Sequence, residues 1–478
     1  MKLAPGPYLY LPIEISAREL DSRLLLSAIA VDRGFEVVLG QKWLMHDNLS
    51  YMPPGVLLTK TLTDSDGRFM EVARRRGYRT ASIDEEIPGL IATKQGLRWV
   101  MRNAVDAADL IFAAGADHHA ALAAKFPDRR DRIMVAGNPR WDLLRPDLRA
   151  AVAAEAEGLR ARYGRFFLIN TNLGLTNSAK GPPETIVRSL VRTGRIDMER
   201  KEDRAFIAAA RQLEIANAAS IKELLRLIMD RFPDHRVVLR PHPGERLRLW
   251  RDCARALPRV SVIREGAAAP WILACEAMIH TNCTTGVEAF ALGKPAICLR
   301  PAEPPEMDIY VAPLVNPVVR SVAECIKVLQ SVVGDRPFPE SDHVNWQNNF
   351  DQFIAARTGA LASYRIVDAI AERFYGAGLN AAVGADNPWR PKRGYRGTIR
   401  RSRSRLSLMP DVDGDVVASR IRQWASLLGL ADNLEVQVCG DRMFHVYAGA
   451  RRVPETVSPA IVALVHRLMK KRKALLPA

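Results

Sequence analysis

The sequence predicts an α/β protein built from two doubly wound halves that face a cleft. Apolar, strand-like runs alternate with helix-like segments from residue 8 to residue 142, and a second series of this kind spans residues 166–299. The chain has 478 residues, which is too many for one ordinary core. Strands that alternate with helices predict mostly parallel sheets covered on both faces.

The first half is assigned to residues 1–150 and opens with an apolar strand that leads into a helix ending near Ala30. Short apolar runs of this kind are typical of buried strands. Strands are expected at Tyr8–Ile13, Phe35–Leu39, Gly55–Leu58, Tyr78–Ile83, Asp109–Phe112 and Ile133–Val135.

The second half is assigned to residues 151–378 and follows a helix-like connector, Ala150–Tyr163. A long helix is expected at Phe206–Arg231, and a polar segment lies between Asn170 and Arg204. A loop of that length inside a compact domain predicts a functional lid or a disordered stretch, and we favour a lid. Strands are expected at Phe166–Ile169, Val237–Leu239, Val260–Ile263, Ala277–Ile279 and Pro295–Leu299.

Residues 379–478 differ from the rest and are assigned to a basic linker with a small appended α+β module. The stretch Asn387–Arg405 carries eight basic residues and no acid, which is half of the net charge of +16. Beyond it, a helix is expected at Val416–Leu428 and strands at Leu434–Val438 and Met443–Tyr447.

Composition narrows the functional classes. No apolar run is long enough to span a membrane and no secretion signal opens the chain, so we expect a cytoplasmic protein. The six cysteines contain no Cys-x-x-Cys pair, which argues against a zinc site and against a disulfide framework. A pI near 9.8 indicates an anionic partner such as a phosphate, an acidic sugar, a nucleic acid or a membrane surface.

Two short segments carry the clearest chemistry. In Arg240-Pro241-His242-Pro243 the prolines hold the backbone extended around the imidazole. In the segment His280–Ala289, threonine hydroxyls and backbone amides stand at an expected helix start, which favours an anion. Glu288 would accept hydrogen bonds from a ribose or complement the helix dipole. The expected phosphate-binding residues are Arg240, His242, Pro243, Asn282, Thr284, Thr285, Gly286 and Glu288.

An acidic cluster, Asp84-Glu85-Glu86, follows a strand of the first half. Neighbouring carboxylates raise one another's pKa, which suits a general base that deprotonates an acceptor hydroxyl. Glu85 and Glu86 are therefore candidate catalytic residues, and a solvated loop is the alternative.

Further polar residues are expected along an acceptor site or the cleft: Glu14, Arg18, Asn138, Arg140 and Asn172. A surface pair between Glu14 and Arg18 and a hinge at Asn138–Arg140 are the alternatives. Asp64-Ser65-Asp66 is only a weak metal signal, and the sequence contains neither a P-loop nor a Gly-x-Ser-x-Gly motif. We expect no bound metal and no cofactor.

The two-half pattern with Arg-Pro-His-Pro and Thr-Thr-Gly-x-Glu resembles the GT-B fold glycosyltransferases of bacterial surface polysaccharide assembly, which have two Rossmann-like domains. Capsule and lipopolysaccharide Kdo transferases and bacterial sialyltransferases, which use CMP-activated sugars, carry an acidic pair, a His-Pro motif and a Ser/Thr pair in this order. The resemblance covers roughly residues 8–374. In this chain Ile87-Pro88 separate the acids from Gly89, where that family has glycine directly.

The resemblance implies an inverting, metal-independent transferase with Glu85 or Glu86 as base, His242 assisting departure of CMP, and Thr284 and Thr285 binding its phosphate. A glycan or lipid-linked acceptor is expected, with Arg390–Arg405 holding the protein at the anionic inner membrane face. The alternatives are a CDP-glycerol-type polyol-phosphate transferase or a UDP-sugar 2-epimerase. A nucleic-acid-binding protein is the non-enzyme alternative and is not expected, because no aromatic-interleaved basic motif occurs.

Overall fold

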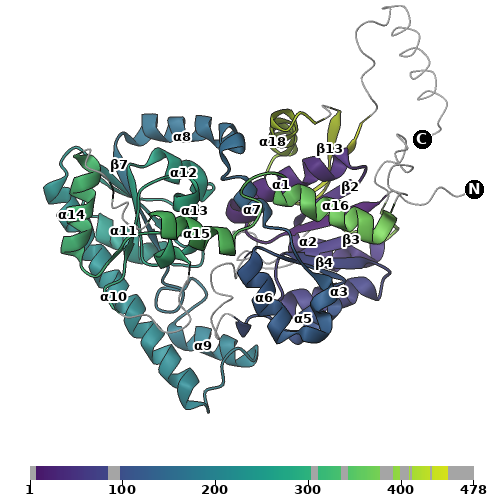
Figure 1. Ribbon diagram of the computed structural model, residues 1–478, viewed down its shortest axis with the longest axis horizontal. Helices are drawn as coiled ribbons and strands as arrows, with labels where there is room; N and C mark the ends of the chain where they lie inside the picture. The colour runs from purple at the N-terminus through teal and green to yellow at the C-terminus, as the bar shows by residue number, and fades with distance from the viewer. Residues whose placement is uncertain are drawn as a thin grey trace, which may run out of the picture.

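The computed structural model describes residues 7–83, 85, 97–302, 311–334, 338, 343–376, 391–398, 409, 412–430 and 433–449. Over these residues it confirms the predicted fold class, since each half contains a parallel sheet covered by helices (Figure 1). Each strand expected from the sequence is present, with ends that differ by one or two residues.

The first half is built on an eight-stranded sheet in the order β13-β14-β2-β1-β3-β4-β5-β6. Strands β1 to β6 pair in parallel, whereas β14 pairs antiparallel with β2 and with β13. The strands are β1 (Tyr8–Ile13), β2 (Glu36–Gln41), β3 (Val56–Thr59), β4 (Arg79–Ile83), β5 (Leu110–Ala113), β6 (Ile133–Val135), β13 (Leu434–Gly440) and β14 (Met443–Ala448). The helices of this part of the chain are α1 (Ser16–Asp32), α2 (Lys42–Asn48), α3 (Asp64–Arg74), α5 (Arg102–Ala107), α6 (Ala116–Lys125) and α7 (Pro139–Asp142).

The second half is built on a six-stranded, wholly parallel sheet in the order β12-β11-β10-β7-β8-β9. Its strands are β7 (Phe166–Thr171), β8 (Arg236–Pro241), β9 (Val260–Val262), β10 (Ala277–His280), β11 (Ala296–Leu299) and β12 (Val318–Val319). The helices are α8 (Ala150–Tyr163), α9 (Pro183–Arg192), α10 (Lys201–Arg231), α11 (Leu247–Ala254), α12 (Ala268–Ala274), α13 (Thr284–Ala291), α14 (Val322–Val333) and α15 (His343–Phe353). Short 3-10 turns lie at Leu49–Tyr51, Pro127–Arg132, Pro146–Leu148 and Ala312–Leu314.

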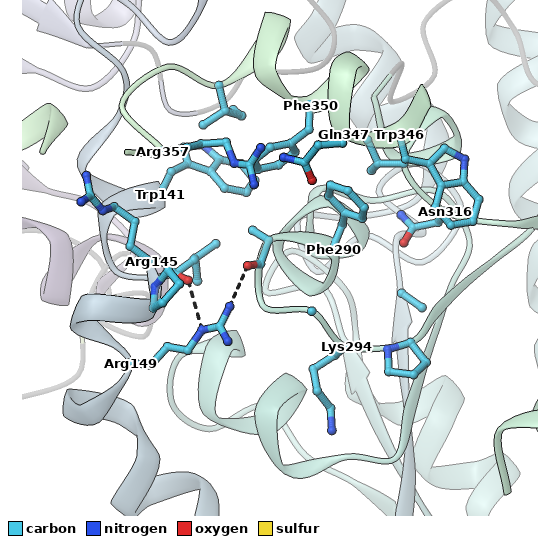
Figure 2. Close-up of a pocket in the computed structure, with 18 of the residues that line it drawn as sticks. Trp141, Arg145, Arg149, Phe290, Lys294, Asn316, Trp346, Gln347, Phe350 and Arg357 are labelled. Carbon is cyan, nitrogen blue, oxygen red and sulfur yellow. Dashed lines mark hydrogen bonds between the residues drawn. The ribbon is translucent and has the colours of Figure 1, made fainter. Parts of the chain in front are cut away.

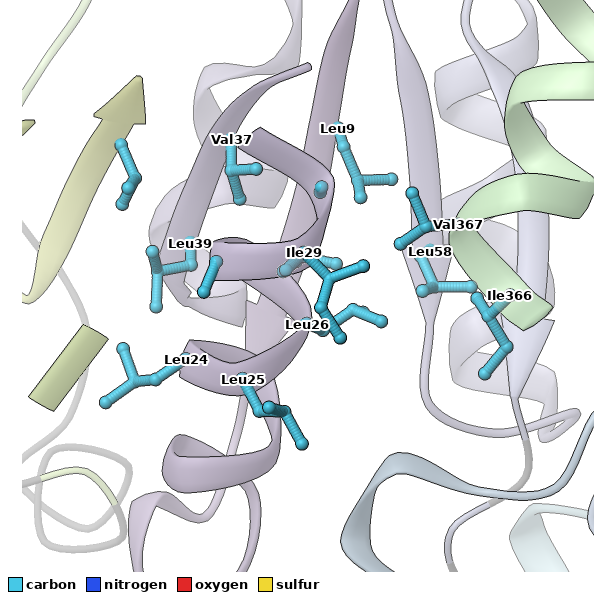
Figure 3. Packing of buried hydrophobic residues seen from close by; sticks show 14 of the residues in the cluster. Leu9, Leu24, Leu25, Leu26, Ile29, Val37, Leu39, Leu58, Ile366 and Val367 are labelled. Carbon is cyan, nitrogen blue, oxygen red and sulfur yellow. The ribbon is translucent and has the colours of Figure 1, made fainter. Parts of the chain in front are cut away.

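Each sheet has a core on both faces because side chains alternate along a strand. In β1, Leu9 and Leu11 face one core while Tyr8 and Tyr10 face the other. Figure 3 shows the first of these cores, where Leu26 and Ile29 of α1 pack between the strands and Val367. Burial on both faces explains why these strands are continuous apolar runs in the sequence.

The chain returns to the first half after it has built the second. Helix α16 (Ala362–Tyr375) and helix α18 (Gly414–Leu427) both pack against α1, and Trp424, Phe444 and Val446 belong to the same core as β1. Residues 362–376, assigned from sequence to the second domain, therefore lie on the first. The appended module is likewise part of the first half, because β14 pairs with β2, which would otherwise be an edge strand.

The polar segment that was predicted to be a lid includes helical structure. It contains α9 and the beginning of α10, and none of the side chains of α9 is buried. Of the basic stretch, residues 391–398 lie in the described part, and Lys392 and Arg396 are exposed there. Their backbone amides donate to Tyr51 O and Asn48 Oδ1. No helix in the described part of the chain is long and apolar enough to cross a bilayer.

Candidate functional site

The order of the second sheet places a ligand site at the carboxyl ends of β7 and β10. The chain runs from β7 to β8 and β9 on one side and then continues at β10 on the other side of β7. Such a reversal leaves a crevice beyond the strand ends. Asn170 at the end of β7 reaches across it, and its Nδ2 donates to Thr285 Oγ1 at 2.9 Å.

A cavity of about 180 Å³, here called the cleft cavity, lies at this position and is lined by both halves. It adjoins a wider cavity of about 1030 Å³, with which it shares Asp21, Pro243 and Arg264. Four arginines and one histidine line the cleft cavity against two carboxylates, so it favours an anion. The polar residues of its wall include Arg18, Asp21, Arg140, Asn170, Thr171, Arg240, His242, Arg264, Thr284, Thr285 and Glu288.

The imidazole of His242 is held in one tautomer. Its Nδ1 accepts a hydrogen bond from the Gly244 backbone N–H at 3.1 Å, so in the neutral ring the proton is on Nε2. A Cβ at position 244 would lie 3.2 Å from this Nδ1, which is why glycine suits that position. His242 is exposed and lines the cleft cavity.

Glu245 is the residue that organises the histidine loop, and it was not among the site residues predicted from the sequence. This carboxylate is fully buried and accepts from the His242 backbone N–H at 3.1 Å and from Thr171 Oγ1 at 2.7 Å. It also accepts from Asn177 Nδ2 at 3.1 Å and from Trp250 Nε1 at 2.9 Å. An acid three residues after a His-Pro pair was the available signal, but its partners are distant in the sequence.

Arg240 lines the cleft cavity and is fixed by its surroundings. Its guanidinium donates to the carbonyl oxygens of Glu265 and Gly266 at 2.8 and 2.9 Å and lies 5.0 Å from the ring centroid of Trp271. Burial lowers the pKa of Arg240 to about 10, so the group remains charged at neutral pH. It contributes a fixed positive charge beside His242.

The start of α13 faces the same cavity. Thr284 and Thr285 occupy its first turn, where backbone N–H groups have no partner within the helix. The turn before it depends on His280, whose buried Nδ1 accepts from the Asn282 N–H at 3.1 Å and from the Cys283 N–H at 3.4 Å. Asn282 has a φ of 67°, and the side-chain amide of this buried residue has no hydrogen-bond partner among the described residues.

Gly286 is required by the ring of His280. A Cβ there would come within 2.3 Å of His280 Nε2, which a rigid buried ring does not allow. Burial lowers the pKa of His280 to about 3, so this histidine is neutral. The Thr-Thr-Gly pattern thus combines hydroxyls for a ligand with a glycine for close packing.

The two halves meet through Glu288 and Arg140. Arg140 Nη2 donates to Glu288 Oε1 at 2.6 Å, and its Nη1 donates to the carbonyl oxygen of Glu85 at 3.3 Å. Burial raises the pKa of Glu288, and the positive charge of Arg140 opposes this. Asn138 positions the arginine, because its Oδ1 accepts from the Arg140 N–H at 3.0 Å at the start of α7. Glu288 therefore contacts an arginine of the other half in this structure.

The carboxylate of Glu85 does not line the cleft cavity. It is buried at 3 % exposure and its Oε1 lies 3.0 Å from Arg23 Nη1, which is itself inaccessible. Asp84 and Glu86 lie outside the described residues. The structure therefore brings Arg18, Arg140, Arg240, His242, Thr284, Thr285 and Glu288 together on one cavity wall, and Glu85 is not on that wall.

Glu14 and Asn172 line other cavities. Glu14 is on the wall of the wider cavity, and its Oε2 lies 3.0 Å from Lys60 Nζ. That lysine also donates to the buried Glu19 at 2.9 Å. Asn172 lines a cavity of about 670 Å³ on the α9 side, which it shares with His242 and Lys180.

The acids proposed as a weak metal signal have other partners. Asp64 pairs with Arg68 and accepts from Asn103 Nδ2 at 3.1 Å. Asp66 pairs with Lys42 and accepts from Thr61. Among the described residues, no group of three or more His, Cys, Asp or Glu side chains is placed to hold a metal ion.

Comparison with known proteins establishes the fold. No protein-family model and no curated protein sequence matches the chain. A solved structure of a histidine-to-alanine variant of the wall teichoic acid polymerase TagF is similar, with 10% identity, a TM-score of 0.50, and coverage of 80% of this chain and 91% of that one.

Two UDP-GlcNAc 2-epimerases are also similar in structure. The one from Neisseria meningitidis, bound to UDP-GlcNAc, has 12% identity and a TM-score of 0.46 over 76% of this chain and 99% of that chain. The one from Methanocaldococcus jannaschii, in complex with UDP-GlcNAc and UDP, has 14% identity and a TM-score of 0.42 over 76% and 98%. The chain thus has two Rossmann-like domains in the GT-B arrangement.

Proposed function

We propose that the protein is an inverting, metal-independent glycosyltransferase of surface-carbohydrate synthesis that takes a sugar from a nucleotide-linked donor. One observation carries this proposal: His242 and the first turn of α13 lie on the wall of a single arginine-rich cavity between the two halves. This set of residues, His242 with Thr284 and Thr285, is here called the phosphate clamp. The phosphate clamp suits the leaving phosphate of an activated donor.

The chemistry follows from where charge develops. An acceptor hydroxyl attacks the anomeric carbon, the bond from that carbon to the phosphate oxygen breaks, and the electron pair of that bond remains on the phosphate. Nε2–H of His242, the hydroxyls of Thr284 and Thr285, and the amides of the α13 start are donors that stabilise this charge. Arg240 adds a positive charge that requires no rearrangement during the reaction.

The base that takes the acceptor proton stays a proposal. Glu86 is one candidate. Glu85 is the other, but its carboxylate lies 3.0 Å from Arg23 Nη1 and would have to move away from that arginine to act as a base. Glu14 and Asp21 are accessible from the wider cavity and offer an alternative on the same side of the cleft. Glu14 lies 3.0 Å from Lys60 Nζ, and Asp21 lies 2.8 Å from Arg420 Nη1.

The donor is proposed to be a CMP-linked acidic sugar, because the cleft cavity has more positive than negative side chains. The GT-B fold by itself does not choose a donor, since transferases and epimerases share it. A CDP-glycerol-type transferase and a UDP-sugar 2-epimerase are therefore included as alternatives in the test.

The test is nucleotide release from CMP-Kdo, CMP-sialic acid, CDP-glycerol and UDP-GlcNAc, each with a mixture of candidate acceptors. We expect release of CMP from a CMP-sugar, and a fall of about 10²- to 10⁴-fold in the His242→Ala variant. The matched control is His46→Ala, which changes a half-exposed histidine of α2 outside the cleft cavity. The donor assignment would be overturned if nucleotide were released only from CDP-glycerol, or if UDP-GlcNAc were the only compound converted. The role of the phosphate clamp would be overturned if the His242→Ala variant released nucleotide as fast as the wild type.

A further inference from the structure

Another cavity, here called the hinge cavity, adjoins the cleft cavity and has a volume of about 480 Å³. Most of its wall comes from α7 with the turn that follows, the end of α13 with the turn that follows, and α15 with the turn that follows (Figure 2). Val315, Asn316 and Phe338 also line it. The hinge cavity and the cleft cavity are lined by different residues, except that Leu144 lines both. The volume of the hinge cavity is within the range of small-molecule sites, which is about 300–1,000 Å³.

One wall of the hinge cavity is aromatic. The ring of Phe350 lies 5.9 Å from that of Trp141 in an edge-to-face arrangement and 5.4 Å from that of Phe290. Trp346, one turn earlier on α15, continues this wall and is partly exposed (Figure 2). Such rings provide flat apolar surface on which an aromatic group stacks.

The polar part of the lining is cationic. Arg145, Arg149, Lys294 and Arg357 line the hinge cavity, and no Asp or Glu of the described residues does. Arg145 and Arg357 have carboxylate partners, Asp147 and Asp351.

The other two cations have no carboxylate partner in the described part of the chain. Arg149 donates to the carbonyl oxygens of Ala291 and Leu144 at 3.0 and 3.5 Å. The amino group of Lys294 has no hydrogen bond there; burial lowers its pKa, and the negative charge of Glu276, which does not line the hinge cavity, opposes this. An anion in the hinge cavity would therefore meet four cationic side chains and no carboxylate on the described lining.

We propose that the hinge cavity is a second ligand site for an organic phosphate that carries an aromatic ring. The ring stacks among Trp141, Phe290 and Trp346, which are partly exposed, and the phosphate lies near Arg149 and Lys294. This site is independent of the donor proposed for the cleft cavity, because its residues come from other positions. Phenyl phosphate is the smallest probe that has both features.

The test is isothermal titration of the full chain with phenyl phosphate, inorganic phosphate and phenol. We expect one saturable site for phenyl phosphate in the wild type, with binding at least about tenfold weaker for inorganic phosphate and for phenol. Lys294→Glu and Trp346→Ala should each weaken phenyl phosphate at least about tenfold. Both side chains are partly exposed, and thermal melting by circular dichroism checks that the variants are folded.

Two control variants separate this site from others. Lys327→Glu makes the same charge change at an exposed lysine of α14, and His242→Ala alters the cleft cavity. Both should bind phenyl phosphate like the wild type. The proposal would be overturned if the Lys294→Glu variant bound phenyl phosphate as tightly as the wild type, or if the Lys327→Glu variant lost as much affinity as the Lys294→Glu variant. It would also be overturned if only the His242→Ala variant lost affinity, or if inorganic phosphate bound as tightly as phenyl phosphate.

Discussion

At the scale of single residues, the candidate site depends on how one carboxylate and one glycine hold His242. Glu245 accepts four hydrogen bonds from backbone and side chains, and this satisfies both of its oxygens without a cation. The Gly244 N–H then fixes the imidazole tautomer. A histidine positioned in this way loses little conformational entropy when it binds a phosphate.

Gly244→Ala tests this arrangement. The new Cβ would lie 3.2 Å from His242 Nδ1 and 3.6 Å from Cε1, so the ring must shift by a few tenths of an ångström or more. We expect the turnover number to fall between about 10- and 100-fold while the melting temperature changes little. The measurement is nucleotide release under saturating donor.

The matched control for that substitution is Gly158→Ala. Gly158 lies within α8, and an added Cβ there has no atom within 4 Å. We expect full activity and a gain in the free energy of unfolding of up to about 1 kcal/mol, because alanine favours a helix over glycine. Unchanged turnover in Gly244→Ala would show that the position of the His242 ring does not limit the reaction.

At the scale of elements, α13 connects the two cavities. Its first turn carries Thr284 and Thr285 into the cleft cavity, and its last turn brings Phe290 into the hinge cavity. With eight residues it is about 12 Å long. The turn before it is held by His280 Nδ1, so the position of the phosphate clamp depends on a histidine that does not itself line the cleft cavity.

His280 should make the protein sensitive to acid. Its folded-state pKa of about 3 is below the usual value of 6.5, so below pH 6.5 the unfolded chain binds a proton that the folded chain does not. Stability is therefore lost as pH falls, by up to about 1.4 kcal/mol per pH unit from this group. In His280→Asn the Oδ1 takes the place of Nδ1 and does not titrate, so we expect a smaller loss between pH 6.5 and pH 5.

The measurement is urea unfolding of the wild type and the variant at both pH values. His280→Gln serves as the comparison, because its carbonyl reaches the position of Nε2 and cannot accept from the N–H groups of Asn282 and Cys283. We expect His280→Gln to be destabilised at both pH values. An identical loss of stability in the wild type and in His280→Asn would rule out His280 as the source of acid sensitivity.

At the scale of the whole molecule, the two halves are not consecutive pieces of the chain. Helices α16 and α18 and strands β13 and β14 return to the first half, and Asp142 of α7 accepts from the backbone N–H groups of Ala362 and Ser363 at 2.9 and 2.8 Å. Arg140 and Glu288 tie the halves together across the cleft. A change in the angle between the halves would therefore alter both cavities.

Deleting residues 379–478 should unfold the first half. The deletion removes Trp424, Phe444 and Val446 from its core and exposes the edge of β2. We expect an insoluble product, or one without a cooperative thermal transition by circular dichroism. A soluble, cooperatively melting truncated protein would show that this segment is dispensable for the first half.

A test of the proposed attachment to an anionic membrane therefore needs substitutions instead of a deletion. Lys392, Arg393 and Arg396 are exposed, and Lys392 and Arg396 are anchored through backbone groups. Changing all three to Glu should reduce the free energy of binding to phosphatidylglycerol vesicles, measured by co-sedimentation, by at least about 1 kcal/mol per residue. The melting temperature should not change. A variant that pellets as the wild type does would remove this stretch from the membrane proposal.

The sequence by itself determined the elements and the composition of the phosphate clamp. Continuous apolar runs such as Tyr8–Ile13 predict buried parallel strands, because a strand covered on both faces has no polar side. Pro241 and Pro243 around His242, and Thr-Thr-Gly at a helix start, are local patterns whose chemistry depends on neighbours in the chain. The structure places His242, Thr284 and Thr285 on the wall of one cavity, and their binding of a phosphate stays a prediction.

Tertiary structure decided what depends on partners distant in the sequence. Glu85 was a candidate base by its position after a strand, yet its carboxylate faces Arg23, 62 positions earlier in the chain. Glu245 and the hinge cavity were not predicted, because their contacts join strands and helices that no sequence period relates. Strand β14 of the C-terminal hairpin likewise pairs with β2, because the open edge of β2 and an apolar hairpin face meet only in the folded protein.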